Sequence, residues 1–223
     1  VVAGQALALR PMEMLVLRRV SDGAFHYAKA ASFWDPDPAD RADMQAFCRD
    51  VGRHLHESVG YRGVFTIDGV MTRDGFRPTE LNPRFGAALM IVSRGAPCSL
   101  YLLHLLIAEG LELDWRPAEM ERLLLALADE TRVGGANAAT DRAVEADDRG
   151  AFVLDAGGWR LAAEGEPPHA TAVLGPSSWG GIAISKLVPE ETPSGPSVGP
   201  RVAGLLNFLD AHWELGVGEL EGA

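Results

Sequence analysis

Three polar side chains recur at every second position of a short run near the middle of the chain. Glu80, Asn82 and Arg84 all stand within the stretch RPTELNPRFG. Because the side chains of a β-strand alternate between its two faces, an extended run through Pro83 places all three on the same face. That face would carry two oxygen ligands and one fixed cation.

A second acidic residue, Asp68, lies on the preceding run GVFTIDGVMT. An Arg-Asp-Gly turn joins the two runs, which predicts an antiparallel hairpin. We expect a three-residue loop, residues 73–75, because it pairs Asp68 directly with Glu80. A two-residue loop, residues 74–75, would place the two carboxylates on opposite faces unless a bulge intervened.

Asp68, Glu80 and Asn82 together form a compact set of hard oxygen ligands of the kind that holds Mg²⁺ beside phosphate oxygens and water. The set contains no imidazole or thiolate, which argues against zinc or copper. Arg84 is placed to neutralise a phosphoryl group or a developing oxyanion. The alternative is a polar sheet face that is only solvated, which is common in hairpins.

Composition limits the partners. The 223 residues include 31 acidic and 20 basic side chains, a net charge of −11, which disfavours nucleic acid. The longest strongly apolar run, residues 100–108, is shorter than the ~20 residues that span a bilayer, so no membrane partner is expected.

Two distant cysteines favour a reducing cytoplasm. The chain starts at Val1 without a targeting pattern, which favours a piece of a longer protein.

Turn and periodicity signals predict mixed α and β structure. Residues 14–20 and 25–33 are expected to form a hairpin. A helix is expected to start at the cap Asp37 and to end at Gly60. The nearly all-apolar run 97–109 predicts a helix that is buried all round.

The character of the sequence changes after residue 111. A helix is expected at 117–131, and the small residues 134–137, GGAN, lack the lysine of a phosphate loop and are interpreted as a flexible connector. Short strands and a last helix with Val202, Leu205 and Trp213 on one face follow. These patterns predict a first domain at residues 1–112 and an appended domain at 113–223.

The stretch GYRGVFTIDGVMTRDGFRPTELNPRFGAAL resembles the metal-binding hairpin in the C-terminal part of ATP-grasp ligases. The resemblance implies that Asp68 and Glu80 are the two Mg²⁺-bridging carboxylates, Asn82 the amide ligand and Arg84 a catalytic arginine directed at the reacting phosphate or acid. Glu80 would thereby also contact the nucleotide. The run RPMEMLVLRR looks like the strand after the adenine hinge, where Glu13 matches an acidic position near the nucleotide.

This resemblance implies an α+β fold, with the C-terminal half of an ATP-grasp domain, an antiparallel sheet with packed helices, followed by a small α+β domain. The family's nucleotide lysines and glycine-rich lid would lie upstream of this chain. The runs FWDPDP and LDAHWELGVGEL are similar to those of pheganomycin-type actinobacterial peptide ligases.

The activity implied by the resemblance is an ATP- and Mg²⁺-dependent joining of a carboxylic acid to an amine, through an acyl phosphate. The partners would be a small acid and an amino acid or peptide amine, and the sequence leaves a homo-oligomer open. Two alternatives remain. One is a kinase or carboxylase of the same fold, and the other is a degenerate binding module whose acidic face is only solvated.

Overall fold

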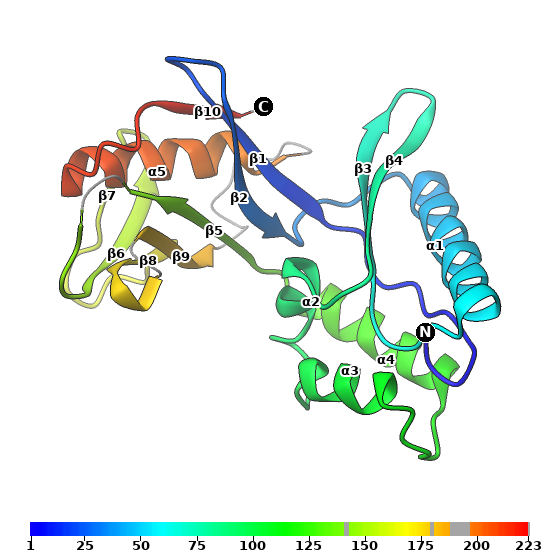
Figure 1. The fold of residues 1–223 in the computed structure, drawn as a ribbon. Helices are drawn as coiled ribbons and strands as arrows, with labels where there is room; N and C mark the ends of the chain where they lie inside the picture. The colour runs from blue at the N-terminus through cyan, green and yellow to red at the C-terminus, as the bar shows by residue number, and fades with distance from the viewer. Residues whose placement is uncertain (141–142, 179–180, 188–196, 223) are drawn as a thin grey trace. The chain divides into compact units, whose positions relative to one another are not determined.

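The computed structural model describes residues 1–140, 143–178, 181–187 and 197–222. Their contacts divide the chain into two compact units, each built from segments far apart in the sequence. Unit 1 comprises Val1–Met12 and Asp35–Arg132, and unit 2 comprises Glu13–Trp34 and Val133–Ala223. Both units combine helices with antiparallel strands (Figure 1), which confirms the expected mixed α+β class.

The compact units follow a different division from the expected domains 1–112 and 113–223. Residues 13–34 join the C-terminal part of the chain, and residues 113–132 stay with the N-terminal part. The chain therefore passes between the units three times. The domain boundary near residue 112 stays a prediction. The compact units of the structure are divided at other positions.

The long helix of unit 1, α1 (Pro38–Val59), begins and ends where the sequence predicted. The Asp37 side chain accepts a hydrogen bond of 2.9 Å from the Ala39 N–H, and Pro38 occupies the first turn. Gly60 ends the helix in the left-handed conformation, with φ of 66°. These local signals act within one turn of each end, so they need no tertiary contact.

Helix α1 packs on the hairpin of β3 (Thr66–Thr72) and β4 (Gly75–Asn82). The Phe47 ring lies edge-on to the Phe76 ring at a centroid separation of 6.5 Å. Gly52 is buried, and a Cβ added there would lie 2.5 Å from Ala6 Cβ and 3.1 Å from the ring of Phe65, the residue before β3. Glycine at this position therefore lets the helix approach the N-terminal segment and the start of the strand that carries Asp68.

Three further helices complete unit 1: α2 (Ala87–Val92), α3 (Leu100–Ala108) and α4 (Pro117–Glu130). The prediction that the apolar helix α3 is buried all round was wrong. Leu100 and Ile107 are buried, whereas Leu102 is 59% exposed. Only one side of α3 contacts other described parts of unit 1, and a uniformly apolar sequence cannot indicate which side is covered.

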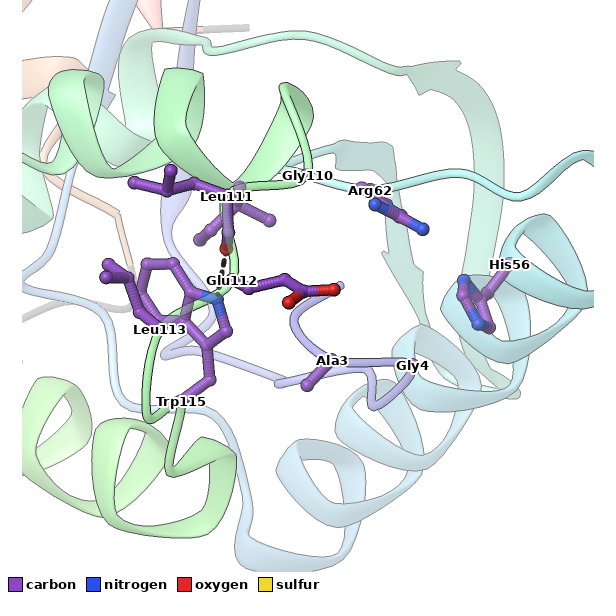
Figure 2. Close-up of a pocket in the computed structure, with 10 residues that line it drawn as sticks. Ala3, Gly4, His56, Arg62, Gly110, Leu111, Glu112, Leu113 and Trp115 are labelled. Atoms are coloured by element: carbon purple, nitrogen blue, oxygen red, sulfur yellow. Dashed lines mark hydrogen bonds between the residues drawn. The ribbon is translucent and has the colours of Figure 1, made fainter.

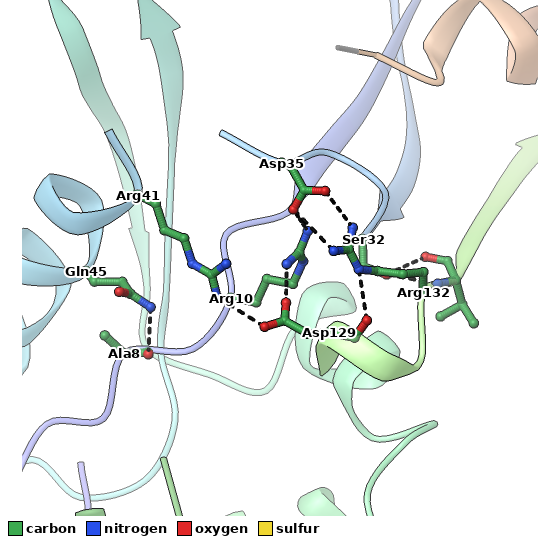
Figure 3. Close-up of polar contacts among 9 residues, drawn as sticks. Ala8, Arg10, Ser32, Asp35, Arg41, Gln45, Asp129 and Arg132 are labelled. Atoms are coloured by element: carbon green, nitrogen blue, oxygen red, sulfur yellow. Dashed lines mark hydrogen bonds and ion pairs between the residues drawn. The ribbon is translucent and has the colours of Figure 1, made fainter. Parts of the chain in front are cut away.

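Ion pairs around Arg10 connect the separate segments of unit 1 (Figure 3). The Arg10 guanidinium is 1% exposed and pairs with Asp129 at the end of α4 and, at 2.5 Å, with Asp35. Arg132 also pairs with Asp35, at 3.1 Å, and Arg41 of α1 lies 3.6 Å from Asp129. Arg132 and Arg10 together hold the pKa of Asp35 below its ordinary value. The buried Arg10 guanidinium thus contacts two carboxylates, which offset the cost of burying its charge.

The described strands of unit 2 form one antiparallel sheet in the order β10-β1-β2-β5-β9-β8-β6-β7. The strands are β1 (Glu13–Arg19), β2 (Phe25–Ala31), β5 (Gly134–Ala139), β6 (Asp148–Asp155), β7 (Gly158–Leu161), β8 (Ala170–Gly175), β9 (Gly181–Leu187) and β10 (Leu220–Gly222). A 3₁₀ turn, η1 (Pro176–Ser178), follows β8. The expected first hairpin is therefore confirmed as β1 and β2.

Helix α5 (Gly199–Trp213) buries its apolar side in the core of unit 2. Val202, Leu205 and Leu206 have no exposed area and belong to the same core cluster as Leu15 and Leu17 of β1. The spacing of the helix residues is that of one helix face, as the sequence indicated. The N-terminal hairpin and the C-terminal helix thus share one core.

The interpretation of residues 134–137 as a flexible connector was wrong, because they belong to β5. This strand pairs with β2 on one side and β9 on the other, and Ala136 is 1% exposed. A Cβ at Gly134 would lie 3.0 Å from the Phe33 ring. Its small residues therefore fit a closely packed sheet, although glycine and alanine carry little strand propensity.

Candidate metal centre on the β3–β4 hairpin

The turn of the hairpin has two residues, Arg73 and Asp74, and not the expected three. Thr72 pairs with Gly75, whose φ of 94° is readily adopted by glycine. The Thr72 hydroxyl donates to the Gly75 carbonyl at 2.9 Å and accepts from the Asp74 N–H at 3.1 Å. Continued without interruption, this register would place Asp68 opposite Thr79 and away from Glu80.

A β-bulge restores the expected pairing. Gly69 pairs with Pro78, but the next pair is Asp68 with Glu80, so Thr79 is an extra residue on β4. The Thr79 hydroxyl donates to the Asp68 carbonyl at 3.3 Å. The pairing of the two carboxylates was therefore predicted correctly, but its cause is a bulge, which the sequence offered only with a loop of residues 74–75, whereas the loop comprises residues 73–74.

Two residues account for the bulge at this place. Pro78 has no N–H to donate, so a regular ladder would already lack one hydrogen bond there. A Cβ at Gly69 would come within 2.5 Å of the Arg77 carbonyl oxygen and of the Phe76 ring. A glycine in one strand opposite a proline in the other is the sequence signal that could have identified the bulge in advance.

The predicted ligands lie together on the hairpin. The Asn82 amide donates to Asp68 Oδ2 at 3.0 Å, and Asn82 pairs with Thr66 across the strands. Arg84 donates to Asn82 Oδ1 at 3.4 Å, although the chain leaves the strand at Asn82. Asp68 and Asn82 are half-buried, whereas Glu80 and Arg84 are exposed.

The surroundings of Asp68 in this cluster raise its pKa. Its partial burial and, after that, the nearby Glu80 carboxylate raise the pKa of Asp68, while Arg84 and the Asn82 amide oppose that shift. The ionised form of Asp68 is therefore less favourable here than in water. A divalent cation between the carboxylates would reverse this effect, because it attracts both negative charges.

The donor set fits Mg²⁺ in kind. Asp68, Glu80 and Asn82 offer carboxylate and amide oxygens, which are the ligands that Mg²⁺ selects, and water and phosphate oxygens usually complete its coordination. Among the described residues, no group of three or more His, Cys, Asp or Glu side chains is arranged to hold a metal. The candidate centre thus rests on two carboxylates and one amide, with Asn82 Oδ1 as its neutral ligand.

Glu13 lies in unit 2, a different compact unit from that of Asp68. One of its oxygens accepts a hydrogen bond of 3.0 Å from the Val198 N–H, and the other accepts from the Ser197 hydroxyl. These groups stand immediately before α5, whose cap residue Val198 has no side-chain cap of its own. Glu13 therefore caps this helix from β1, a role that its sequence neighbourhood did not indicate.

His104, on α3, has a structural role. Its Nδ1 accepts a hydrogen bond of 3.2 Å from the Val64 N–H, just before β3. Burial lowers the pKa of His104, which favours the neutral ring that can accept. His104 therefore helps to place the start of the strand that carries Asp68.

Comparisons with known proteins give no relative from which a role could be transferred. No family model, no curated protein and no solved structure matches the chain. Among the described residues, no helix combines the length and apolar character needed to cross a membrane. The candidate function therefore rests on the geometry of the hairpin and of the remaining surface.

Proposed function

We propose that this chain is the metal-binding part of an ATP- and Mg²⁺-dependent carboxylate–amine ligase of the ATP-grasp type. The observation that carries the proposal is the pairing of Asp68 with Glu80 across a bulged hairpin, with Asn82 hydrogen-bonded to Asp68. Two adjacent carboxylates and an amide form a site for a cation that also contacts phosphate oxygens.

In this proposal the metal would be held by Asp68, Glu80 and Asn82, and it would supply charge neutralisation at the β- and γ-phosphates of ATP. Arg84 would orient the transferred phosphoryl group or the acid by paired N–H donors. Its contact with Asn82 Oδ1 is long, at 3.4 Å, so its guanidinium keeps donors for a ligand.

The proposed ligation has two steps. A carboxylate oxygen of the acid forms a bond to the γ-phosphorus, and the bond to ADP breaks. The amine nitrogen then attacks the acyl carbon, inorganic phosphate leaves, and the amine loses a proton. The acid and the amine belong to the classes of small carboxylic acids and of amino-acid or peptide amines.

The test uses the full-length protein that contains this chain. It is incubated with ATP, Mg²⁺, a pool of amino acids and peptide acids, and hydroxylamine, and acyl hydroxamates are detected by mass spectrometry. Hydroxylamine captures acyl phosphates, so a hydroxamate mass identifies the activated acid. Glu80→Gln and Asn82→Ala should remove the product while circular dichroism stays unchanged, and Asp74→Asn in the exposed turn is the matched control.

Two outcomes would favour the alternatives. ATP turnover with a stable phosphorylated product and no hydroxamate would favour a kinase or carboxylase of the same fold. If ATP and Mg²⁺ are neither bound nor turned over, or if the two variants behave like the control, the hairpin is a solvated surface and the ligase proposal is refuted.

A further inference from the structure

A cavity of about 550 Å³ lies in unit 1, among the N-terminal segment, the end of α1 and the chain that follows α3 (Figure 2). Its volume is in the range of sites that bind small molecules. None of Asp68, Glu80 and Asn82 lines it. The cavity is therefore a candidate binding site separate from the β3–β4 hairpin.

One side of this cavity is apolar. Leu111, Leu113 and Trp115 line it, and the two leucines are 46% and 52% exposed. The Trp115 Nε1–H donates to the Leu111 carbonyl at 3.0 Å, which fixes the indole ring relative to the cavity wall. A fixed aromatic ring beside exposed leucines offers a surface for an apolar side chain.

The other side carries opposite charges. Arg62 and Glu112 line the cavity, and neither makes a hydrogen bond or ion pair within the part of the chain that the structure describes. The Arg62 guanidinium lies against Gly110, because a Cβ there would be 2.3 Å from one of its terminal nitrogens. One cation and one anion, each without a protein partner among the described residues, are thus presented to the same cavity.

His56 adds a defined acceptor. Its Nδ1 lies 3.2 Å from the Tyr61 carbonyl, and a carbonyl can only accept, so the Nδ1 of the neutral ring carries the hydrogen. Nε2 is then an acceptor, and it faces Gly4, another lining residue. Glu112 and His56 can accept from an ammonium group, whereas Arg62 can donate to a carboxylate.

We propose that this cavity binds a small zwitterion with an apolar side chain, namely a free apolar α-amino acid. Arg62 receives the carboxylate, Glu112 and His56 receive the ammonium group, and Leu111, Leu113 and Trp115 contact the side chain. The inference does not depend on the magnesium hairpin, so it is tested without metal or nucleotide.

The first experiment uses the whole chain and titrates four probes by isothermal calorimetry and by the Trp115 indole N–H signal, assigned with a Trp115→Phe variant. L-Phenylalanine should bind with a Kd on the order of 1 mM. Phenethylamine lacks the carboxylate, 3-phenylpropanoate lacks the amine and L-serine lacks the apolar group. Each should bind about tenfold more weakly, since each loses one set of contacts.

Two variants then separate the charges. Glu112→Gln should weaken L-phenylalanine about tenfold and leave 3-phenylpropanoate unchanged. Arg62→Met should weaken both of those ligands and leave phenethylamine unchanged. Arg73→Met, in the exposed hairpin turn, is the matched control and should behave like the unmodified chain. Circular dichroism confirms that each variant is folded.

The proposal is overturned if no probe saturates, or if the four probes bind equally well. It is also overturned if both charge variants change all ligands to the same extent, because the cavity would then be only an apolar surface. None of these outcomes concerns ATP turnover, so a failure here is distinguishable from a failure of the proposed ligase activity.

Discussion

At the scale of single residues, Asp68 has an environment that disfavours its ionised form. It is half-buried opposite Glu80, and its pKa is raised. A raised carboxylate pKa means that the folded state binds protons more readily than the unfolded state. The ionised Asp68 therefore reduces stability once the pH exceeds the ordinary pKa of aspartate, in the absence of a cation.

The substitution Asp68→Asn should accordingly raise the free energy of unfolding at pH 7 without metal, by about 0.5–2 kcal/mol, because it removes a partly buried charge and its repulsion with Glu80. It should at the same time weaken the binding of Mn²⁺, a probe for Mg²⁺, by about tenfold or more. Urea denaturation and electron paramagnetic resonance measure the two quantities. Asp74→Asn is the control, and a destabilised Asp68→Asn that keeps its metal affinity would contradict this view.

His104 gives a second prediction at this scale, one of pH dependence. Its folded pKa is lowered, so below about pH 6.5 the unfolded state binds the additional proton more readily. Stability should therefore fall as the pH decreases through that value. His104→Asn offers an uncharged acceptor for the Val64 N–H, so this variant should show a smaller decrease between pH 7 and pH 5. The comparison is made by urea denaturation, and identical pH profiles would refute the assignment.

At the scale of elements, the bulge in β4 decides whether Asp68 and Glu80 lie on the same face of the hairpin. Gly69→Ala introduces a Cβ against the Arg77 carbonyl and the Phe76 ring. We expect a loss of about 1–3 kcal/mol in unfolding free energy and a lower affinity for Mn²⁺, because the strands must shift. Val70→Ala is a suitable control, since Val70 is 57% exposed and its truncation should cost less than about 0.5 kcal/mol. Equal effects of the two substitutions would argue against this role of the bulge.

The cap that β1 provides for α5 is the second test at this scale. Glu13→Gln keeps the shape of the side chain but removes the charge that faces the Val198 N–H at the helix start. The expected cost is about 1 kcal/mol in unfolding free energy. Glu219→Gln, an acidic residue outside the helix and the named strands, serves as the control. If Glu13→Gln leaves stability unchanged but impairs nucleotide binding by the full-length protein, the sequence-based role of Glu13 is favoured instead.

At the scale of the whole molecule, each compact unit depends on distant segments of the chain. The core of unit 2 includes Leu15, Leu17, Ala28 and Ala31 from the N-terminal hairpin. A chain limited to residues 113–223 lacks these side chains and leaves β5 without its neighbour β2. We therefore expect that this shortened chain does not fold, as judged by poorly dispersed amide signals in NMR spectra. Well-dispersed signals would instead support a domain boundary near residue 112.

The sequence predicted the elements whose causes are local. The Asp37 cap and the Gly60 end define α1 within a turn of each end, and alternating residues identified the strand pair with Asp68 and Glu80. The sequence missed features that depend on partners far along the chain. The strand β5 is built from small residues with little intrinsic preference, and Glu13 contacts a residue 185 positions away.

By itself, the sequence determined which oxygen-bearing residues are candidates for a metal site and that they lie on adjacent strands, because residue types and short-range periodicity are properties of neighbouring positions. Only the tertiary structure decided the exposed side of α3 and the union of the N-terminal hairpin with the C-terminal part. These features arise from contacts between segments that are far apart in the sequence. Which of these contacts form depends on the packing and free energy of the whole folded chain.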